Sequence, residues 1–253
     1  MAPWADPFER NLQPEVMDQP GLDVQLHGQA LRALARINVL SRTASILWPP
    51  IRDFGRRQAN RPISILDLAS GGGDVTIGLW HRLRRAGIEA RIVGRDKSPT
   101  AIEIAQRRAG EFGADVEFVL GDALAPNASE SFDVVISSLF MHHLNRADAL
   151  LLMERMKQTA RHMVVLNDLV RSRLGYALAV AVTQLVTRSP VARIDGPRSV
   201  QGAFSLPEVS RLAVEAGLAD ATIRRCWPCR FLLSWNRPRL AGEREVRACG
   251  SAT

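Results

Sequence analysis

The stretch from Ile65 to Asp74, ILDLASGGGD, constrains the fold more than any other part of the chain. An apolar run, typical of a buried strand, ends in three consecutive glycines with an aspartate on each side. Glycines at such a point let the backbone turn sharply and approach a ligand closely. The stretch therefore predicts a strand, a tight ligand-binding turn and a following helix.

The chain after Pro62 repeats this alternation of strands and helices. We expect strands at 63–68, 90–96, 116–120, 133–139 and 162–168, and helices near 74–86, 99–112, 146–160 and 171–187. Two late strands, 221–227 and 230–236, are close enough to pair as an antiparallel hairpin. We predict an α/β fold: a Rossmann-like, doubly wound, mostly parallel seven-stranded sheet with an antiparallel edge hairpin, plus an N-terminal helical appendage.

Capping residues mark where several of these helices begin and end. Ser98-Pro99 supplies an N-cap and a first-turn proline, Asn145 opens the helix near 146–160, and Ser205 with Glu208 has capping-box spacing. Gly217 is expected to end that last helix. In the appendage, a helix from Leu26 onward is expected to be interrupted by Trp48-Pro49-Pro50, and the stretch from 188 through Gly202 is expected to be rich in turns.

The composition disfavours a nucleic-acid surface and a membrane span. The net charge is +7 and the sequence pI about 10.5, but the arginines are scattered and form no aromatic-interleaved basic stripe of the kind that stacks bases. The first ten residues, MAPWADPFER, lack the features of a secretory signal, and the apolar run 174–186 is shorter than the roughly 18 residues of a span. Three cysteines favour a reducing compartment, so we expect a cytoplasmic protein.

Asp67 separates two kinds of cofactor that this fold could bind. The turn lies at the carboxyl edge of the sheet, and Asp96 ends the second strand where it could bind ribose hydroxyls. These features suit either a dinucleotide or another adenosine cofactor. A carboxylate at position 67 would repel a pyrophosphate, whereas it would attract the cationic methionine part of S-adenosylmethionine.

Four motifs in order make the chain resemble the class I S-adenosylmethionine-dependent methyltransferases, over residues 60–237. They are Asp67 to Gly73, Asp96, Gly121-Asp122-Ala123 and FDVVISSLFMHHL (132–144). The resemblance, to small-molecule enzymes such as those of bacterial polyketide and quinone-type pathways, implies S-adenosylmethionine as cofactor. The cofactor-binding residues it implies are Asp67, Ala69, Gly71, Gly73, Asp96, Lys97, Asp122, Ala123 and Ser138.

The resemblance also suggests how the chain is divided. Residues 1–60 are expected to form a helical cap or substrate lid, and 61–240 the cofactor-binding methyltransferase domain with a helical insertion at 169–204. Residues 241–253 are expected to be a flexible tail. Ala69 stands where the family has a glycine, and we expect it to be tolerated because a methyl group costs little if φ stays negative.

The methyl acceptor is less constrained by the sequence. His142 and His143 follow the fourth strand and are candidates for a general base, with His143 preferred. Tyr176 and Asn167 are candidates for contacting the acceptor. No Asn/Asp-Pro-Pro-aromatic motif ends the fourth strand, and Ser137 and Ser138 replace the first carboxylate of metal-dependent relatives, so we expect no metal.

We therefore predict a methyltransferase that acts on a small hydrophobic acceptor, at a phenolic oxygen or an activated ring carbon. The apolar helix at 174–186 could roof the acceptor pocket. Two alternatives stay open: an RNA methyltransferase that uses the basic surface, and a non-catalytic module that binds S-adenosylmethionine. Assembly as a homodimer is also open.

Overall fold

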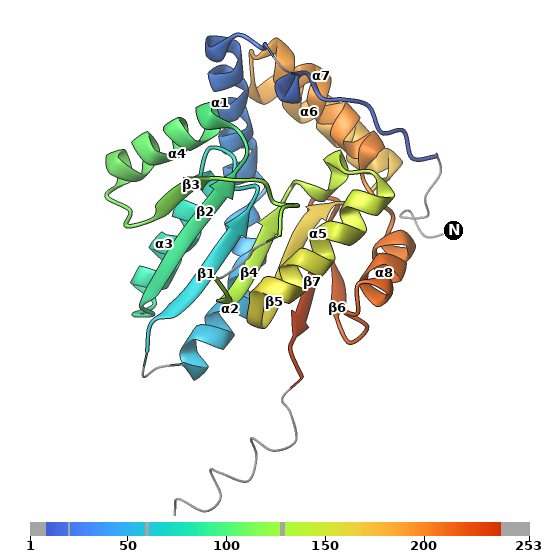
Figure 1. Cartoon of the computed structure of the whole chain (residues 1–253). Coiled ribbons are helices and arrows are strands. Elements are labelled where there is room, and N and C mark those ends of the chain that lie inside the picture. Colours follow the sequence, from blue (N-terminus) through green and yellow to red (C-terminus); the bar gives the residue numbers. More distant parts are fainter. Residues whose placement is uncertain (1–8, 20, 59–60, 127–129, 239–253) are drawn as a thin grey trace, which may run out of the picture.

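A computed structural model of the chain describes residues 9–19, 21–58, 61–126 and 130–238 (Figure 1). The flexible tail expected at 241–253 lies outside these residues, as do the first eight residues of the N-terminal appendage. No helix in the described ranges combines the length and apolar character that crossing a membrane requires.

A seven-stranded sheet forms the centre of the molecule, as predicted. Its strands are β1 (Ile63–Leu68), β2 (Ala90–Asp96), β3 (Glu117–Leu120), β4 (Phe132–Ser138), β5 (Ala160–Leu169), β6 (Thr222–Cys226) and β7 (Arg230–Asn236). The spatial order is β3-β2-β1-β4-β5-β7-β6, and β7 runs antiparallel to both of its neighbours. The mostly parallel sheet with its antiparallel edge hairpin is therefore confirmed.

Helices cover both faces of the sheet (Figure 1). On one face lie α2 (Thr43–Arg57), α3 (Asp74–Arg85) and α4 (Pro99–Phe112), and on the other lie α5 (Arg146–Thr159) and α8 (Leu206–Glu215). Three more helices, α1 (Val24–Leu40), α6 (Arg173–Val186) and α7 (Pro190–Gly202), lie over the edge where the parallel strands end. Two short 3-10 turns, η1 (Val16–Asp18) and η2 (Met141–His143), also lie near that edge.

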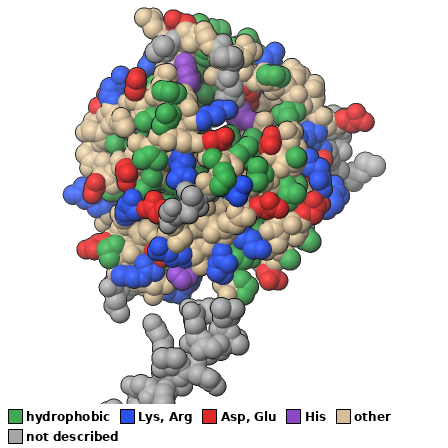
Figure 2. Space-filling view, in the orientation of Figure 1, with side chains coloured by type: hydrophobic (Ala, Val, Ile, Leu, Met, Phe, Trp, Pro, Cys, Tyr) green, Lys and Arg blue, Asp and Glu red, His purple; other side chains and the backbone are tan. Residues whose placement is uncertain are grey.

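Alternation along each strand divides the core into two layers. In β1, Ile63 and Ile65 pack toward α2, whereas Leu66 and Leu68 pack toward α5. Phe132 is 1% exposed, and burial of a side chain of this size contributes roughly 1.5–3 kcal/mol. Acidic and basic side chains are interspersed over the face drawn in Figure 2, with hydrophobic side chains among them.

The predicted caps stand at the helix ends. The Ser98 side chain accepts a hydrogen bond from the Ala101 amide, and the Asn145 side chain accepts one from the Asp148 amide. Ser205 and Glu208 form the capping box at the start of α8. These local signals explain why the helix starts agree with the sequence analysis.

The interruption expected at Trp48-Pro49-Pro50 is wrong. Pro49 and Pro50 lie inside α2, and the chain breaks earlier, at Arg42, whose φ is 56°. Each proline lacks an N–H group for the carbonyl four residues before it. The helix persists because its amphipathic face is buried, which offsets that loss; the buried residues include Ile46, Leu47, Ile51 and Phe54.

The turn-rich stretch expected before Gly202 is also wrong, because most of it is α7. The Ser189 side chain accepts a hydrogen bond from the Ala192 amide and Pro190 is in the first turn, which is the same signal that opens α4. Gly196 lies within α7, where a Cβ atom would be only 2.5 Å from Thr183 Cγ2 of α6. The glycine therefore permits close packing of two helices rather than a turn.

Candidate functional site

The loop after β1 adopts the sharp turn that its glycines predicted. Gly71 and Gly73 have φ angles of 53° and 74°, in the left-handed region. A Cβ atom on Gly73 would also lie 2.6 Å from Cζ of Phe118, whereas one on Gly71 would meet nothing within 4 Å. Both glycines are required by the backbone conformation, and Gly73 is required by its neighbours as well.

Ala69 does not satisfy the condition under which we expected it to be tolerated. Its φ angle is 59°, so the methyl group lies in the left-handed region that favours glycine. This conformation costs a residue with a Cβ atom about 1 kcal/mol or more. Leu139, after β4, has a φ angle of 55°, so two loops at the same sheet edge are strained.

Asp67 lies behind the loop rather than in the cavity wall. Its side chain is 1% exposed, Oδ2 accepts a hydrogen bond of 2.6 Å from Thr76, and Oδ1 has no partner among the described residues. Burial raises the pKa of Asp67 to about 7, against the lowering effect of Thr76. A cation bound nearby would stabilise the ionised form of this carboxylate.

Asp96 ties the end of β2 to the loop. Its Oδ2 accepts a hydrogen bond of 2.8 Å from the Gly71 amide, and its Oδ1 accepts one of 2.9 Å from the Ser98 amide. A carboxylate offers about four acceptor sites, so Asp96 can still accept hydrogen bonds from a ligand in the cavity that it lines.

A cavity of about 440 Å³ lies above the carboxyl edge of the sheet. One wall consists of loop residues, and it includes seven residues from the predicted cofactor set: Ala69, Gly71, Asp96, Lys97, Asp122, Ala123 and Ser138. The opposite wall is largely apolar and comes from α1 and α6; it includes Leu34, Ile37, Leu178, Ala179, Val182 and Val186. The apolar helix expected to roof the pocket does line it.

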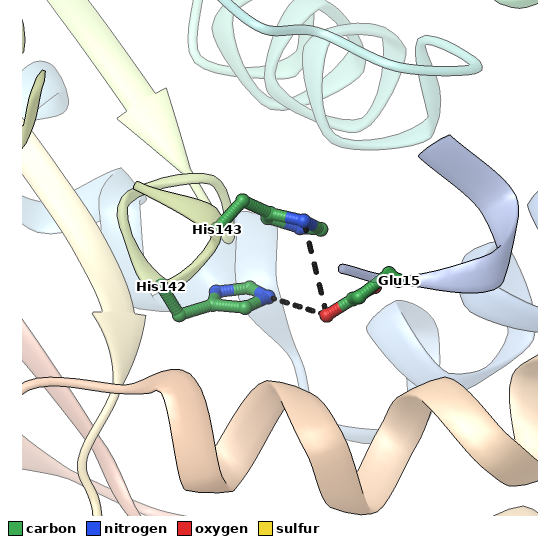
Figure 3. Close-up of side chains that lie close together, drawn as sticks. All are labelled: Glu15, His142 and His143. Carbon is green, nitrogen blue, oxygen red and sulfur yellow. Dashed lines mark ion pairs between the residues drawn. The ribbon is translucent and has the colours of Figure 1, made fainter. Parts of the chain in front are cut away.

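A polar cluster stands at one part of the cavity wall (Figure 3). Nε2 of His142 is 3.6 Å, and Nδ1 of His143 is 3.8 Å, from Oε1 of Glu15. The other ring nitrogen of His142, Nδ1, is 2.6 Å from Oδ1 of the buried Asp168. Burial acts to raise the pKa of Asp168, but the interactions with His142, the Leu169 amide and His143 together outweigh it, and the pKa is lowered. All three members of the cluster line the cavity.

Helix α7 holds Glu15 in this position. Asp195 accepts hydrogen bonds of 2.8 Å and 3.0 Å from the backbone amides of Val16 and Met17. Ser199, one turn along α7, donates a hydrogen bond of 2.5 Å to Oε1 of Glu15. The N-terminal segment is therefore fixed against the histidines by a helix almost 180 residues later in the sequence.

Other charged residues in the wall were missed by the sequence analysis. Asp74 follows the glycines, lines the cavity and is held by Asn38 Nδ2 at 3.0 Å; burial raises its pKa. Arg230 is 4% exposed and bonded to Thr43 and Ser41, and burial lowers its pKa to about 10. Glu15 and Arg230 carried no local signal, whereas Asp74 was part of the glycine stretch.

Two candidates for acceptor contact lie outside the cavity lining. Tyr176 is 38% exposed on α6, whose residues Gly175 and Leu178 line the cavity instead. Asn167 is fully buried in β5, where its Nδ2 donates a hydrogen bond of 2.6 Å to the carbonyl oxygen of Phe231. Gly73 and Asp67 are likewise absent from the lining, and act through the shape and charge of the loop.

Comparison with known proteins identifies the central part of the chain. Residues 65–162 match the family described as a methyltransferase domain, which spans β1 through the start of β5. This central region of the chain is similar to methyltransferase domains. The match covers the loop after β1, the end of β2 and the two histidines, so the loop side of the cavity belongs to the matched region, whereas the lining residues of α1, α6 and α7 lie outside it.

Two relatives of known function are similar to parts of the chain of different length. A release factor glutamine methyltransferase from Geobacter sulfurreducens is 33% identical over 101 residues, which are 38% of this chain and 34% of that protein. A ubiquinone biosynthesis O-methyltransferase from Brucella ovis is 26% identical over 180 residues, 67% of this chain and 69% of that protein. The chain thus spans about a third of the length of the first of these relatives.

A solved structure shares the fold of the methyltransferase domain. Magnesium protoporphyrin IX methyltransferase from Synechocystis, with S-adenosylhomocysteine bound, has a TM-score of 0.53 at 14% identity, covering 88% of this chain and 91% of that one. At this identity the likeness concerns the fold.

The residues of the loop fit S-adenosylmethionine. Burial raises the pKa of the fully buried Asp67 and of the partly buried Asp74 beside the glycines, and a cationic ligand would favour the ionised forms of both carboxylates. A pyrophosphate would have the opposite effect. Gly71, which has a positive φ angle, lines the cavity and exposes its backbone there because it has no side chain.

Proposed function

We propose that this protein transfers a methyl group from S-adenosylmethionine to a phenolic oxygen of a small, largely apolar acceptor. One observation carries the proposal: the loops of the methyltransferase domain and the apolar faces of α1 and α6 line the same cavity. A donor held by the loops and an acceptor held by the helices would then meet inside one enclosure.

Acidic residues in and behind the donor half of the cavity match two parts of the expected ligand. Asp67 and Asp74 would favour the cationic methionine part, and Asp96 would accept hydrogen bonds from ribose hydroxyls. Asp122 and Ala123 would lie beside the adenine. When bound, the sulfonium of S-adenosylmethionine supplies an electrophilic methyl group, and the chain supplies alignment and exclusion of water.

The acceptor half favours an apolar molecule with one polar group. Leu178, Val182 and Val186 of α6 face the cavity, so an apolar ring or chain can be buried there. The histidine cluster supplies polar groups in the same wall, which suits an acidic hydroxyl group. The name of the Brucella relative states O-methyl transfer in ubiquinone biosynthesis for that protein, and this supports an oxygen acceptor here.

The proposal is tested with methyl-labelled S-adenosylmethionine and separate acceptor panels. One panel contains apolar phenols and hydroxylated quinols, one contains ring compounds whose hydroxyl groups are already methylated, and one contains RNA. We expect label in the first panel, in a product with a new O–CH₃ group by mass spectrometry. Label confined to RNA, label on ring carbon, or no label with any panel would contradict the proposal.

A matched pair of variants links the activity to the site. Asp96→Ala removes the expected ribose contact and should lower labelling at limiting S-adenosylmethionine by about 10-fold or more, whereas Asp115→Ala removes an exposed aspartate and should leave labelling unchanged. Equal labelling by both variants would mean that the donor binds elsewhere.

A further inference from the structure

The cluster of Glu15, His142 and His143 brings three donor atoms together at the cavity wall (Figure 3). The two histidines are neighbours in η2, and both rings point toward the Glu15 carboxylate. The three donor atoms lie within 4.8 Å of one another. Glu15 and His142 are 6% and 5% exposed, so two of the three groups are removed from bulk water.

The distances fit a common ligand better than they fit direct hydrogen bonds. Both nitrogen-to-oxygen distances, 3.6 Å and 3.8 Å, exceed normal hydrogen-bond length. Donor atoms at 2.0–2.1 Å from a tetrahedral zinc ion are roughly 3.3 Å apart. Shifts of a few tenths of an ångström in flexible side chains would therefore close the group around an ion.

The surrounding residues orient the donors as those of a metal site do. Asp168 Oδ1 lies 2.6 Å from Nδ1 of His142, which leaves Nε2 on the Glu15 side. Metal-binding histidines usually have such a carboxylate partner on the other ring nitrogen. Ser199 donates a hydrogen bond to the Glu15 carboxylate and so fixes that donor as well.

We propose that Glu15, His142 and His143 bind a divalent cation, zinc by the chemistry of the donor set, with a further coordination position open to the cavity. Two imidazole nitrogens and a carboxylate oxygen suit zinc, whereas magnesium prefers oxygen ligands alone. The sequence analysis missed this cluster and expected no metal, because it considered only the carboxylate that Ser137 and Ser138 replace. Glu15 comes from the N-terminal segment instead.

The role of the cation rests on the proposed function, while its binding does not. The acceptor's hydroxyl oxygen would occupy the open position, and the cation would favour loss of its proton to solvent. That oxygen would then bond to the methyl carbon as the carbon–sulfur bond breaks. The electron pair of that bond stays on sulfur, which gives S-adenosylhomocysteine and the methylated acceptor.

Cation binding is tested on the full chain without a histidine tag, after chelation and dialysis. Calorimetric titration with Zn²⁺ should give one site per chain with a Kd on the order of 1 μM or lower. Glu15→Gln and His143→Gln should each weaken binding by roughly 100-fold, and His81→Gln, on α3, should not. The second variant keeps the test informative if the first destabilises the protein. Less than a tenth of a site per chain, or equal affinity in all variants, would overturn the proposal.

A second measurement separates this proposal from the proposed function. The chelated protein should bind S-adenosylhomocysteine with unchanged affinity but lose at least about 10-fold in methyl transfer, restored by Zn²⁺. Undiminished transfer by the chelated protein would overturn the catalytic role of the cation while leaving the methyltransferase activity intact. Zinc binding without transfer to any acceptor would overturn the catalytic role and the proposed function, and leave the binding site standing.

Discussion

The carboxylate of Asp96 accepts a hydrogen bond from the backbone amide of Gly71, over 2.8 Å. This contact joins the acid at the end of β2 to the glycine loop after β1, so one residue both shapes the loop and faces the cavity. Asp96→Ala should therefore weaken S-adenosylhomocysteine binding by about 10-fold to 100-fold, since a charged hydrogen-bond acceptor is lost. Calorimetric titration measures this, with Asp115→Ala as the exposed control. Equal affinities in the two variants would remove Asp96 from the cofactor site.

The strained backbone at Ala69 gives a prediction about stability. Ala69→Gly should relieve a φ angle of 59°, and should raise the free energy of unfolding by up to about 1 kcal/mol after the entropy of the added glycine is subtracted. Ala86→Gly is the control, because φ there is −90° and glycine offers no relief. Thermal unfolding should therefore shift upward for position 69 and downward for position 86. A downward shift at both positions would mean that Ala69 is not strained.

The buried Asp67 predicts how stability and binding vary with pH. Its pKa of about 7 lies above the ordinary value near 4, so its stabilising contribution is present below pH 4 and is lost as the pH rises through 7. Asp67→Asn should flatten that part of the stability profile. The ammonium group of bound S-adenosylhomocysteine would favour ionised Asp67, so binding of this ligand should tighten from pH 6 to pH 8 in the wild type only. Titrations across this range check both, and an equal pH dependence in the variant would contradict the assignment.

The two sides of α6 predict a difference between matched leucines. Leu178 lines the cavity, whereas Leu185 on the same helix is 86% exposed. Leu178→Ala should raise the KM for an apolar acceptor by about 10-fold or more, because buried methyl and methylene contacts are lost. Leu185→Ala should leave KM unchanged, and neither substitution should alter S-adenosylhomocysteine affinity. Steady-state kinetics with both variants measure this, and equal KM values would place the acceptor elsewhere.

The sequence analysis located those features that depend on nearby residues. Helix starts are fixed by contacts within a few residues, as at Ser98-Pro99, Asn145 and the Ser205–Glu208 pair. The apolar runs of β1 and β4 each predict a buried strand from their own residues. The parallel sheet then brings Asp96 and Asp122 to the same edge, which topology alone requires.

Long-range contacts account for what the sequence analysis missed. Glu15 lies beside the histidines because Asp195 and Ser199 of α7 hold its segment. These residues are far apart in the sequence, so no local sequence pattern could predict the contact. Pro49 and Pro50 stay within α2 because burial of that helix outweighs their local effect. The stretch from 188 through Gly202 was expected to be rich in turns, but it forms α7, which packs closely on α6 at Gly196. The positive φ of Ala69 likewise depends on how its loop joins β1 to α3.

A crystal structure of the protein with S-adenosylhomocysteine tests the central claim most directly, because that claim concerns one cavity shared by donor and acceptor. We predict that the ribose contacts Asp96, that the adenine lies beside Asp122 and that the sulfur faces the apolar wall near His142. Ligand bound outside this cavity, or with its sulfur turned away from α6 and the histidines, would contradict the account.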